Sequence, residues 1–100
     1  MIAKKKSKKN FDKKMLELVK QSLLDDKVIN LKIIDIRKKS AFADFIIVGS
    51  GTSNRHIVTM AKRVKEELKK NFDFNVSVEG MEQSNWVLID ASSIVVNIFR

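Results

Sequence analysis

The chain has 100 residues, of which 20 are Lys or Arg and 12 are Asp or Glu, with 44% hydrophobic residues and no cysteine or proline. This length is enough for one compact core but not for separate catalytic and regulatory domains. The lack of cysteine excludes disulfides, thiolate metal sites and cysteine nucleophiles. No apolar run approaches the ~20 residues that cross a membrane, and the lysine-rich start lacks the apolar region of a secretory signal. We therefore expect a soluble, cytoplasmic protein without a membrane partner.

The formal net charge of +8 is concentrated near the N-terminus. Residues 1–14 contain seven lysines and one acid, whereas residues 15–100 are close to neutral. A lysine run is most often a solvated segment, but it also attracts phosphate groups without reading sequence. We expect residues 1–9 to form a disordered basic tail, either inert or a weak tether to nucleic acid, and residues 10–100 to form a single domain.

The first half of the chain predicts one helix and two strands. Asn10 is a plausible N-cap for a helix from Phe11 to about Leu24. Its apolar stripe consists of Phe11, Met15, Leu18, Val19 and Leu23. Residues 28–37 are rich in β-branched side chains and predict a strand. Residues 44–50 form an uninterrupted apolar run, which is typical of a strand buried on both faces.

The second half predicts one helix and three strands. After a turn at residues 49–54, Thr52 or Ser53 can cap a helix that runs to about Asn71. Its buried face consists of Ile57, Ala61, Val64 and Leu68. Residues 76–79, 86–90 and 94–99 predict strands, and the last two are joined by a tight turn at residues 91–93, which indicates a hairpin. We expect a mixed five-stranded sheet with helices packed on it, in the α/β to α+β range. The strands flanking the second helix need a right-handed crossover if they are parallel neighbours.

The motifs that would indicate an enzyme are incomplete. The Gly49-Ser50-Gly51 turn lies where phosphate-binding loops occur, but it lacks the third glycine of a dinucleotide site and the lysine of a P-loop. Residues 59–64 contain none of the acids that would hold Mg²⁺ in a nucleotidyltransferase. His56 is the single histidine, so a metal site is not indicated, and we expect it on an exposed helix surface. Trp86 is either a core residue or an interface anchor.

Four segments of the chain together resemble the Iojap family, the ribosomal silencing factors. They are residues 33–40, 43–56, 78–80, and 86–90 followed by 94–99. The most specific part is GTSNR at residues 51–55, followed by EG at 79–80 and WV at 86–87. The resemblance implies a nucleotidyltransferase-like fold that has lost its catalytic acids, and hence neither a cofactor nor an enzymatic activity.

The resemblance also implies a partner. Such factors bind the large ribosomal subunit through its fourteenth protein and block joining with the small subunit, which represses translation when nutrients are scarce. The implied contacts lie at Trp86, Ala91, Asp90, Lys39 and Ser40, with a weak contact of the N-terminal lysines to ribosomal RNA and a possible homodimer in the free protein. The alternatives are a large-subunit assembly factor and a small nucleotide-handling enzyme that uses the turn at residues 49–51.

The sequence departs from the family pattern in three places. The usual Asp-x-Gly-Asp turn reads Asp-Ala-Ser-Ser at residues 90–93, and the usual histidine of the last strand is Asn97. The position of Ala91 normally carries a larger apolar side chain. Members usually continue past Phe99 in an acidic, aromatic tail, whereas this sequence ends at Arg100.

Overall fold

The computed structural model describes residues 2–82 and 85–100, which form two helices and five strands. Along the chain, these elements are α1 (Ile2–Asp25), β1 (Ile29–Asp35), β2 (Phe45–Ser50), α2 (Asn54–Phe72), β3 (Ser77–Glu79), β4 (Trp86–Ala91) and β5 (Ile94–Phe99). Their order is the one predicted from the sequence. The predicted polar turn at residues 82–85 lies partly outside the described residues.

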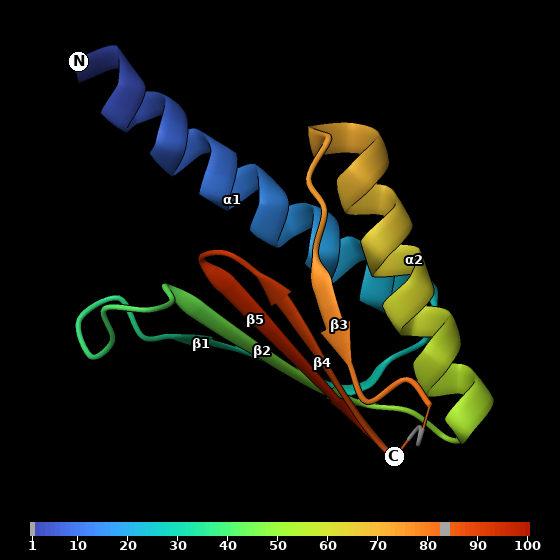
Figure 1. The fold of residues 1–100 in the computed structure, drawn as a ribbon. Helices are drawn as coiled ribbons and strands as arrows, with labels where there is room; N and C mark the ends of the chain where they lie inside the picture. The colour runs from blue at the N-terminus through green and yellow to red at the C-terminus, as the bar shows by residue number, and fades with distance from the viewer. Residues whose placement is uncertain (1, 83–84) are drawn as a thin grey trace.

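The five strands form one mixed sheet in the order β1-β2-β5-β4-β3 (Figure 1). β2 and β5 run parallel, and the other neighbouring pairs are antiparallel. The predicted fold class, an α+β domain built on a mixed five-stranded sheet, is confirmed, as is the antiparallel hairpin of β4 and β5. β3 lies at the edge of the sheet, so the parallel neighbour of β2 is β5 rather than the strand that directly follows α2.

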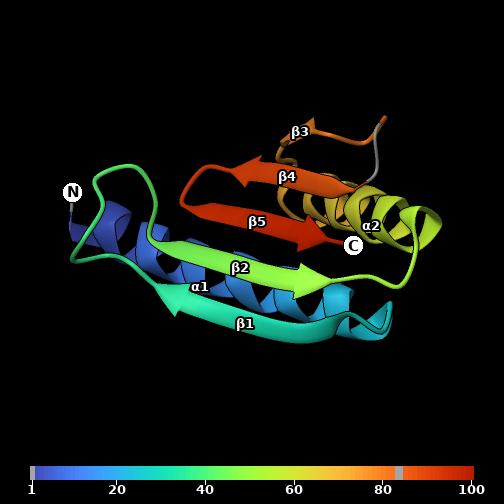
Figure 2. The same ribbon diagram turned by 90° about the horizontal axis from the view of Figure 1, so that it is seen from below.

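Both helices cover the same face of the sheet, and the other face carries no helix (Figures 1 and 2). The core lies between the helices and the covered face, because each helix buries one apolar stripe there. The predicted stripe of α2 is confirmed, and so are the predicted positions Met15, Val19 and Leu23 of α1. From the sheet, the core receives Ile47, Val87, Ile89, Ala91, Ile94, Val96 and Ile98.

Helix α1 begins earlier than the sequence predicted. It starts at Ile2, so Asn10 lies inside the helix instead of capping it, and residues 2–9 are helical rather than disordered. The physical reason is composition: lysine and alanine are good helix formers, and the chain has no proline and no glycine before Gly49 to stop the helix. No helix in the described part of the chain is long and apolar enough to cross a membrane.

Strand β2 is buried on one face only, which corrects the expectation from its apolar run. Ile47 and Gly49 are buried, whereas Ile46 and Val48 are half-buried because they lie on the face without helices. An apolar run of this length is therefore compatible with an uncovered apolar face as well as with a doubly covered strand.

Candidate docking surface on the open face of the sheet

The face of the sheet that no helix covers is largely apolar, and Figure 2 looks directly onto it. Residues directly opposite each other in neighbouring strands share a face, so the register identifies its members. We call this surface the open face. Over β1, β2, β4 and β5 its apolar members are Ile34, Ile46, Val48, Trp86, Leu88, Val95 and Phe99, and its polar members are Lys32, Ser50, Asp90 and Asn97. Trp86, Phe99 and Ile34 are its most exposed apolar side chains, at 51%, 40% and 46%.

Trp86 contacts neighbouring side chains of the sheet and is also partly exposed to solvent. Its ring stacks on that of Phe99, its partner across β4 and β5, with the centroids 5.9 Å apart and the planes within 1°. The indole Nε1 donates a hydrogen bond to Oδ1 of Asn97 at 3.2 Å. These contacts fix the orientation of the ring before any partner binds, which lowers the entropic cost of binding. Of the two predicted alternatives for Trp86, this exposure excludes a core residue and agrees with an interface anchor.

The start of β4 also depends on Gly80. Its φ of 90° lies in the region that favours glycine. A Cβ at this position would collide with the carbonyl oxygen of Trp86. The glycine of the EG pair therefore allows the chain to pass close to the strand that carries Trp86.

Asp90 and Ala91 lie at the far end of β4 from Trp86. Asp90 is exposed on the open face, four residues or about 13 Å along the strand from Trp86. Ala91 is fully buried on the helix-covered face, since an offset of five residues points to the other side of a strand. The expectation that Ala91 is available to a partner is wrong. It belongs to β4 rather than to the following turn, where Ser92 adopts a φ of 62°.

Lys39 and Ser40 lie in the loop between β1 and β2, at the same end of the sheet as Asp90. Lys39 is exposed, while the hydroxyl of Ser40 accepts hydrogen bonds from the backbone N–H groups of Phe42 and Ala43, at 3.0 and 3.3 Å. The loop is tied to the β4–β5 turn because the Asp44 N–H donates to the carbonyl oxygen of Ser93 at 2.7 Å. The structure thus separates the predicted contacts into Trp86 at one end of the sheet and the other four positions at the other.

The same loop contains features that sequence reasoning missed. Phe42 is 93% exposed, the highest value among the large apolar side chains of the described region. The only pattern in the sequence that marks it is an isolated aromatic residue between two alanines in a polar connection. Nearby, the Arg37 guanidinium makes two-point contact with the Asp35 carboxylate, with a shortest distance of 2.6 Å. These hydrogen bonds lower the pKa of Asp35 to about 2.

The glycine turn before α2 has a structural explanation. The Ser53 hydroxyl accepts a hydrogen bond from the backbone N–H of His56 at 3.1 Å, which confirms the predicted N-cap. A Cβ on Gly51 would press against Ile57 and Met60, 2.9 and 3.0 Å away. Close packing therefore accounts for Gly51 without a phosphate.

His56 is half-buried rather than an exposed surface residue, which corrects that expectation. Its Nδ1 accepts a hydrogen bond from the Thr52 N–H at 2.9 Å, so Nε2 carries the proton and donates to the Asp26 carbonyl oxygen at 2.6 Å. The imidazole thus joins the end of α1 to the start of α2. No group of three His, Cys, Asp or Glu side chains suited to a metal ion occurs in the part of the chain that the structure describes.

Comparison with known proteins identifies similar chains. Residues 8–100 match the family model described as "Ribosomal silencing factor during starvation". The ribosomal silencing factor of Zymomonas mobilis is 34% identical over 97 residues, covering 96% of this chain and 73% of that protein. The mouse protein named "Mitochondrial assembly of ribosomal large subunit protein 1" is 24% identical over 86 residues, covering 83% of this chain and 38% of that protein.

Two solved structures share the fold. A crystal structure of a protein from Chromobacterium violaceum superposes with a TM-score of 0.83 at 30% identity, covering 87% of this chain and 72% of that one. A crystal structure of a Bacillus halodurans protein gives a TM-score of 0.82 at 26% identity, covering 88% of this chain and 82% of that one.

Proposed function

The chain belongs to the ribosomal silencing factor family, and on this premise we propose that it binds the large ribosomal subunit through the subunit's fourteenth protein and keeps it from joining the small subunit. The proposal places the protein in the cytoplasm, where it represses translation by occupying a surface rather than by catalysis. The observation that carries it is the open face, on which Trp86 is oriented by Phe99 and Asn97 and is about half exposed as a residue.

The dimensions of the open face suit the centre of a protein interface. Four strands about 4.8 Å apart and six residues long make a patch of roughly 19 by 20 Å. A stable interface buries about 800 Å² on each partner, so the patch supplies its apolar centre and the loop with Phe42 and Lys39 extends its rim. Aromatic side chains at such a centre commonly carry most of the binding energy.

The absence of catalysis is part of the proposal. The turn at residues 49–51 is explained by helix capping and by the packing of Gly51 against Ile57 and Met60. The positions that would supply metal-binding acids in a nucleotidyltransferase, residues 59–64, carry none. A nucleotide-handling enzyme on this fold lacks both of the groups that it needs.

A second role, assistance in assembling the large subunit, is favoured by the name of the mouse relative. Both roles require the same contact with the large subunit and differ in when it forms. An assembly factor would accumulate on immature large subunits, whereas a silencing factor would bind mature ones equally well.

Co-sedimentation with separated, mature ribosomal subunits tests the proposal. We expect stoichiometric binding to the large subunit and none to the small subunit, with most of the affinity surviving moderate salt because the contact is apolar. Equal binding to both subunits that disappears at moderate salt would contradict it, since that pattern is typical of nonspecific attraction between lysines and RNA.

A further inference from the structure

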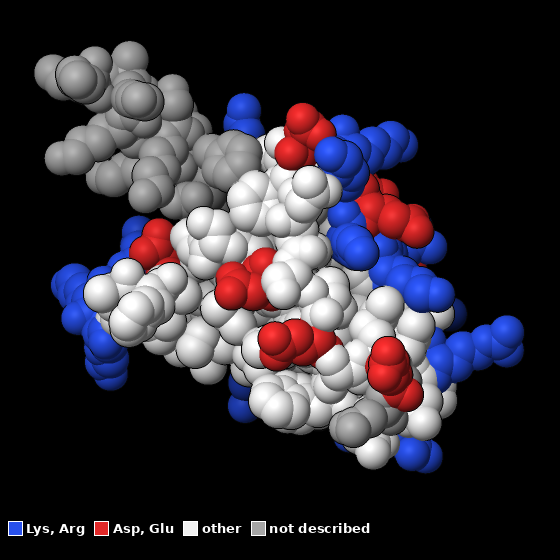
Figure 3. Space-filling view, viewed as in Figure 1, with Lys and Arg blue, Asp and Glu red and all other residues white. Residues whose placement is uncertain are grey.

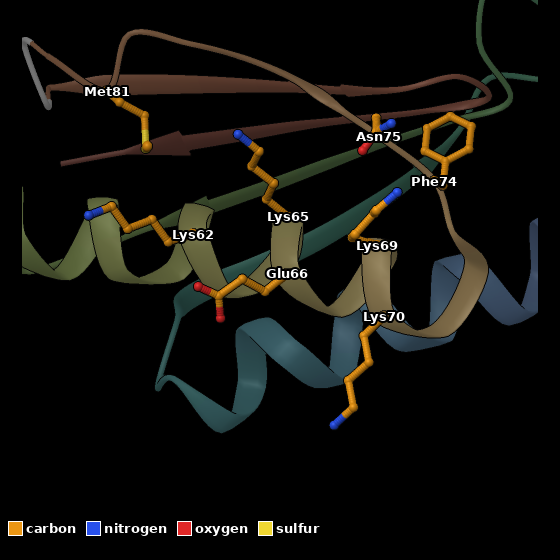
Figure 4. Close-up of a pocket in the computed structure, with 8 residues that line it drawn as sticks. All are labelled: Lys62, Lys65, Glu66, Lys69, Lys70, Phe74, Asn75 and Met81. Atoms are coloured by element: carbon orange, nitrogen blue, oxygen red, sulfur yellow. The ribbon is translucent and has the colours of Figure 1, made fainter.

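A second surface lies on the helix side of the molecule, away from the open face. An open pocket of about 570 Å³ separates α2 from the chain segments on either side of β3 (Figure 4). We call it the basic groove and define it by Lys62, Lys65, Lys69, Phe74 and Met81. Glu66, Lys70 and Asn75 complete its lining.

The lysines of the basic groove form a row along α2. Lys62, Lys65 and Lys69 follow one another at intervals of three and four residues, so they share one side of the helix over about 10 Å. Lys65 and Lys69 rise toward the segment that carries Phe74, whereas Lys70 extends the other way (Figure 4). Lysine and arginine side chains gather over α2 on the molecular surface (Figure 3). Helix α2 contains six of them and only two acids.

Two of the three lysines form no ion pair with a described carboxylate, although Glu66 also lines the groove. Lys69 donates to Asp73 at 2.8 Å, but neither Lys62 nor Lys65 has an ion-pair partner within residues 13–82 and 85–100. Exposed ammonium groups of this kind are balanced by mobile counter-ions. Replacing counter-ions on a polyanion by such lysines is the main source of nonspecific affinity for nucleic acid.

The lining favours one kind of anion. A single bound phosphate is usually held by arginine or by the N–H groups at a helix start, but the groove contains no arginine and Lys62 lies two turns from the start of α2. A row of separate ammonium groups suits a chain with repeated charges. The half-buried ring of Phe74 and the side chain of Met81 add an apolar surface on which a base can rest, and an acidic peptide has no base to use it.

We propose that the basic groove binds the backbone of a single RNA strand. The inference rests on the proposed function, because the RNA closest to a factor on the large subunit is the ribosomal RNA of that subunit. Helix α2, which lines the groove, lies on one side of the sheet, and the open face is on the opposite side. The protein can therefore hold a protein partner and an RNA strand at the same time.

The test compares two double variants of the full chain that remove equal charge. The groove variant combines Lys62→Gln with Lys65→Gln and so removes the unpaired lysines of the groove. The control combines Lys27→Gln with Arg55→Gln, because both of these residues are exposed and lie outside the groove. Affinity for a fluorescent, mixed-sequence single-stranded RNA is measured by anisotropy at several salt concentrations. We expect the groove variant to bind about tenfold more weakly near 0.1 M salt, with the slope of log K against log salt smaller by about 1.4.

Three outcomes would overturn the proposal: equal affinities of the two variants, an unchanged salt slope in the groove variant, or effective competition by poly-glutamate of equal charge. A separate experiment on large subunits keeps the two proposals distinct. There, Trp86→Ala weakens binding without changing the salt slope, whereas the groove variant lowers the slope. If the wild-type protein does not bind large subunits but the two variants still differ in RNA affinity, the proposed function is wrong and RNA binding by the basic groove is supported.

Discussion

At the level of single residues, the indole of Trp86 is the side chain on which the proposed contact depends most. Replacing it by alanine removes the most exposed aromatic group of the open face, and we expect affinity for the large subunit to fall by about 2 kcal/mol, roughly 30-fold. The stability cost is the loss of the stack on Phe99, about 1 kcal/mol. A buried aromatic would instead cost 3 kcal/mol or more, by the usual ~3–5 kcal/mol for such truncations.

Chemical denaturation and a binding isotherm on the same Trp86→Ala protein check both numbers. Leu24→Ala is the matched control, because Leu24 is 44% exposed but lies at the end of α1, away from the open face. The control should bind like the wild type. A Trp86→Ala protein that binds normally once folded would show that the partner docks elsewhere.

Ala91 leads to a different prediction because it is buried. Its side chain faces the helices beside its cross-strand partner Ile94, with no exposed surface. Introducing leucine there overfills the core, so we expect Ala91→Leu to lower the free energy of unfolding by about 1–3 kcal/mol. Subunit affinity of the folded variant should not rise. A stable variant with tighter binding would mean that this end of β4 faces the partner.

Asp35 and Arg37 allow a direct test of the loop geometry by pH. The pKa of Asp35 lies near 2 because its carboxylate accepts hydrogen bonds from the side chain and backbone N–H of Arg37. A lowered pKa means that the interaction stabilises the folded state above pH ~4 and is lost as the pH falls toward 2. Carbon-13 NMR titration should find this midpoint, and Arg37→Gln should return it toward ~3.9. The same midpoint in both proteins would show that the pair does not form in solution.

At the level of elements, the sequence predicts what depends on local pattern and fails where the third dimension decides. The stripe of α2 is periodic, so its buried residues follow directly from the sequence. The sequence pattern does not indicate which face of the sheet the helices cover. That choice leaves one face of β2 half-buried and makes Ala91 inaccessible to a partner. His56 is half-buried because α1 ends beside α2, a contact between segments 30 residues apart. Phe42 lies in a loop, where no hydrophobic periodicity could indicate its exposure.

Helix α1 gives the prediction that belongs to this scale. Burial is described from Lys13 onward, where the first buried side chain is Met15, and five of the eight residues 2–9 are lysines, which rarely enter a core. Deleting residues 2–9 should therefore leave the melting temperature within about 4 °C of the wild type, less than 1 kcal/mol of stability. It should also make large-subunit binding less sensitive to salt, because five lysines are removed. A much larger fall in the melting temperature would show that the first turns of α1 are part of the fold.

At the level of the whole molecule, the two faces have separate tasks in the proposed mechanism. The apolar open face supplies specificity for a protein of the large subunit, and the basic groove adds a salt-dependent contact with RNA. Contacts of the first kind chiefly slow dissociation, while electrostatic contacts chiefly speed association. A protein of 11.5 kDa can obstruct a far larger partner in this way, because an obstruction needs only to occupy part of the joining surface for long enough.

Obstruction and catalysis differ in stoichiometry, and this difference gives the last prediction. When large subunits are incubated with the protein before small subunits are added, light scattering should show a loss of joined ribosomes that rises in proportion to the protein and saturates near one molecule per large subunit. Each bound molecule blocks one subunit and no more, because nothing is turned over. When the same amount of protein is added after the subunits have joined, joined ribosomes should be lost only at the rate at which they dissociate spontaneously. Trp86→Ala should shift the curve to roughly 30-fold higher concentration, while Leu24→Ala leaves it in place. Complete inhibition by a small fraction of one equivalent would contradict obstruction and point to an enzymatic change in the subunit.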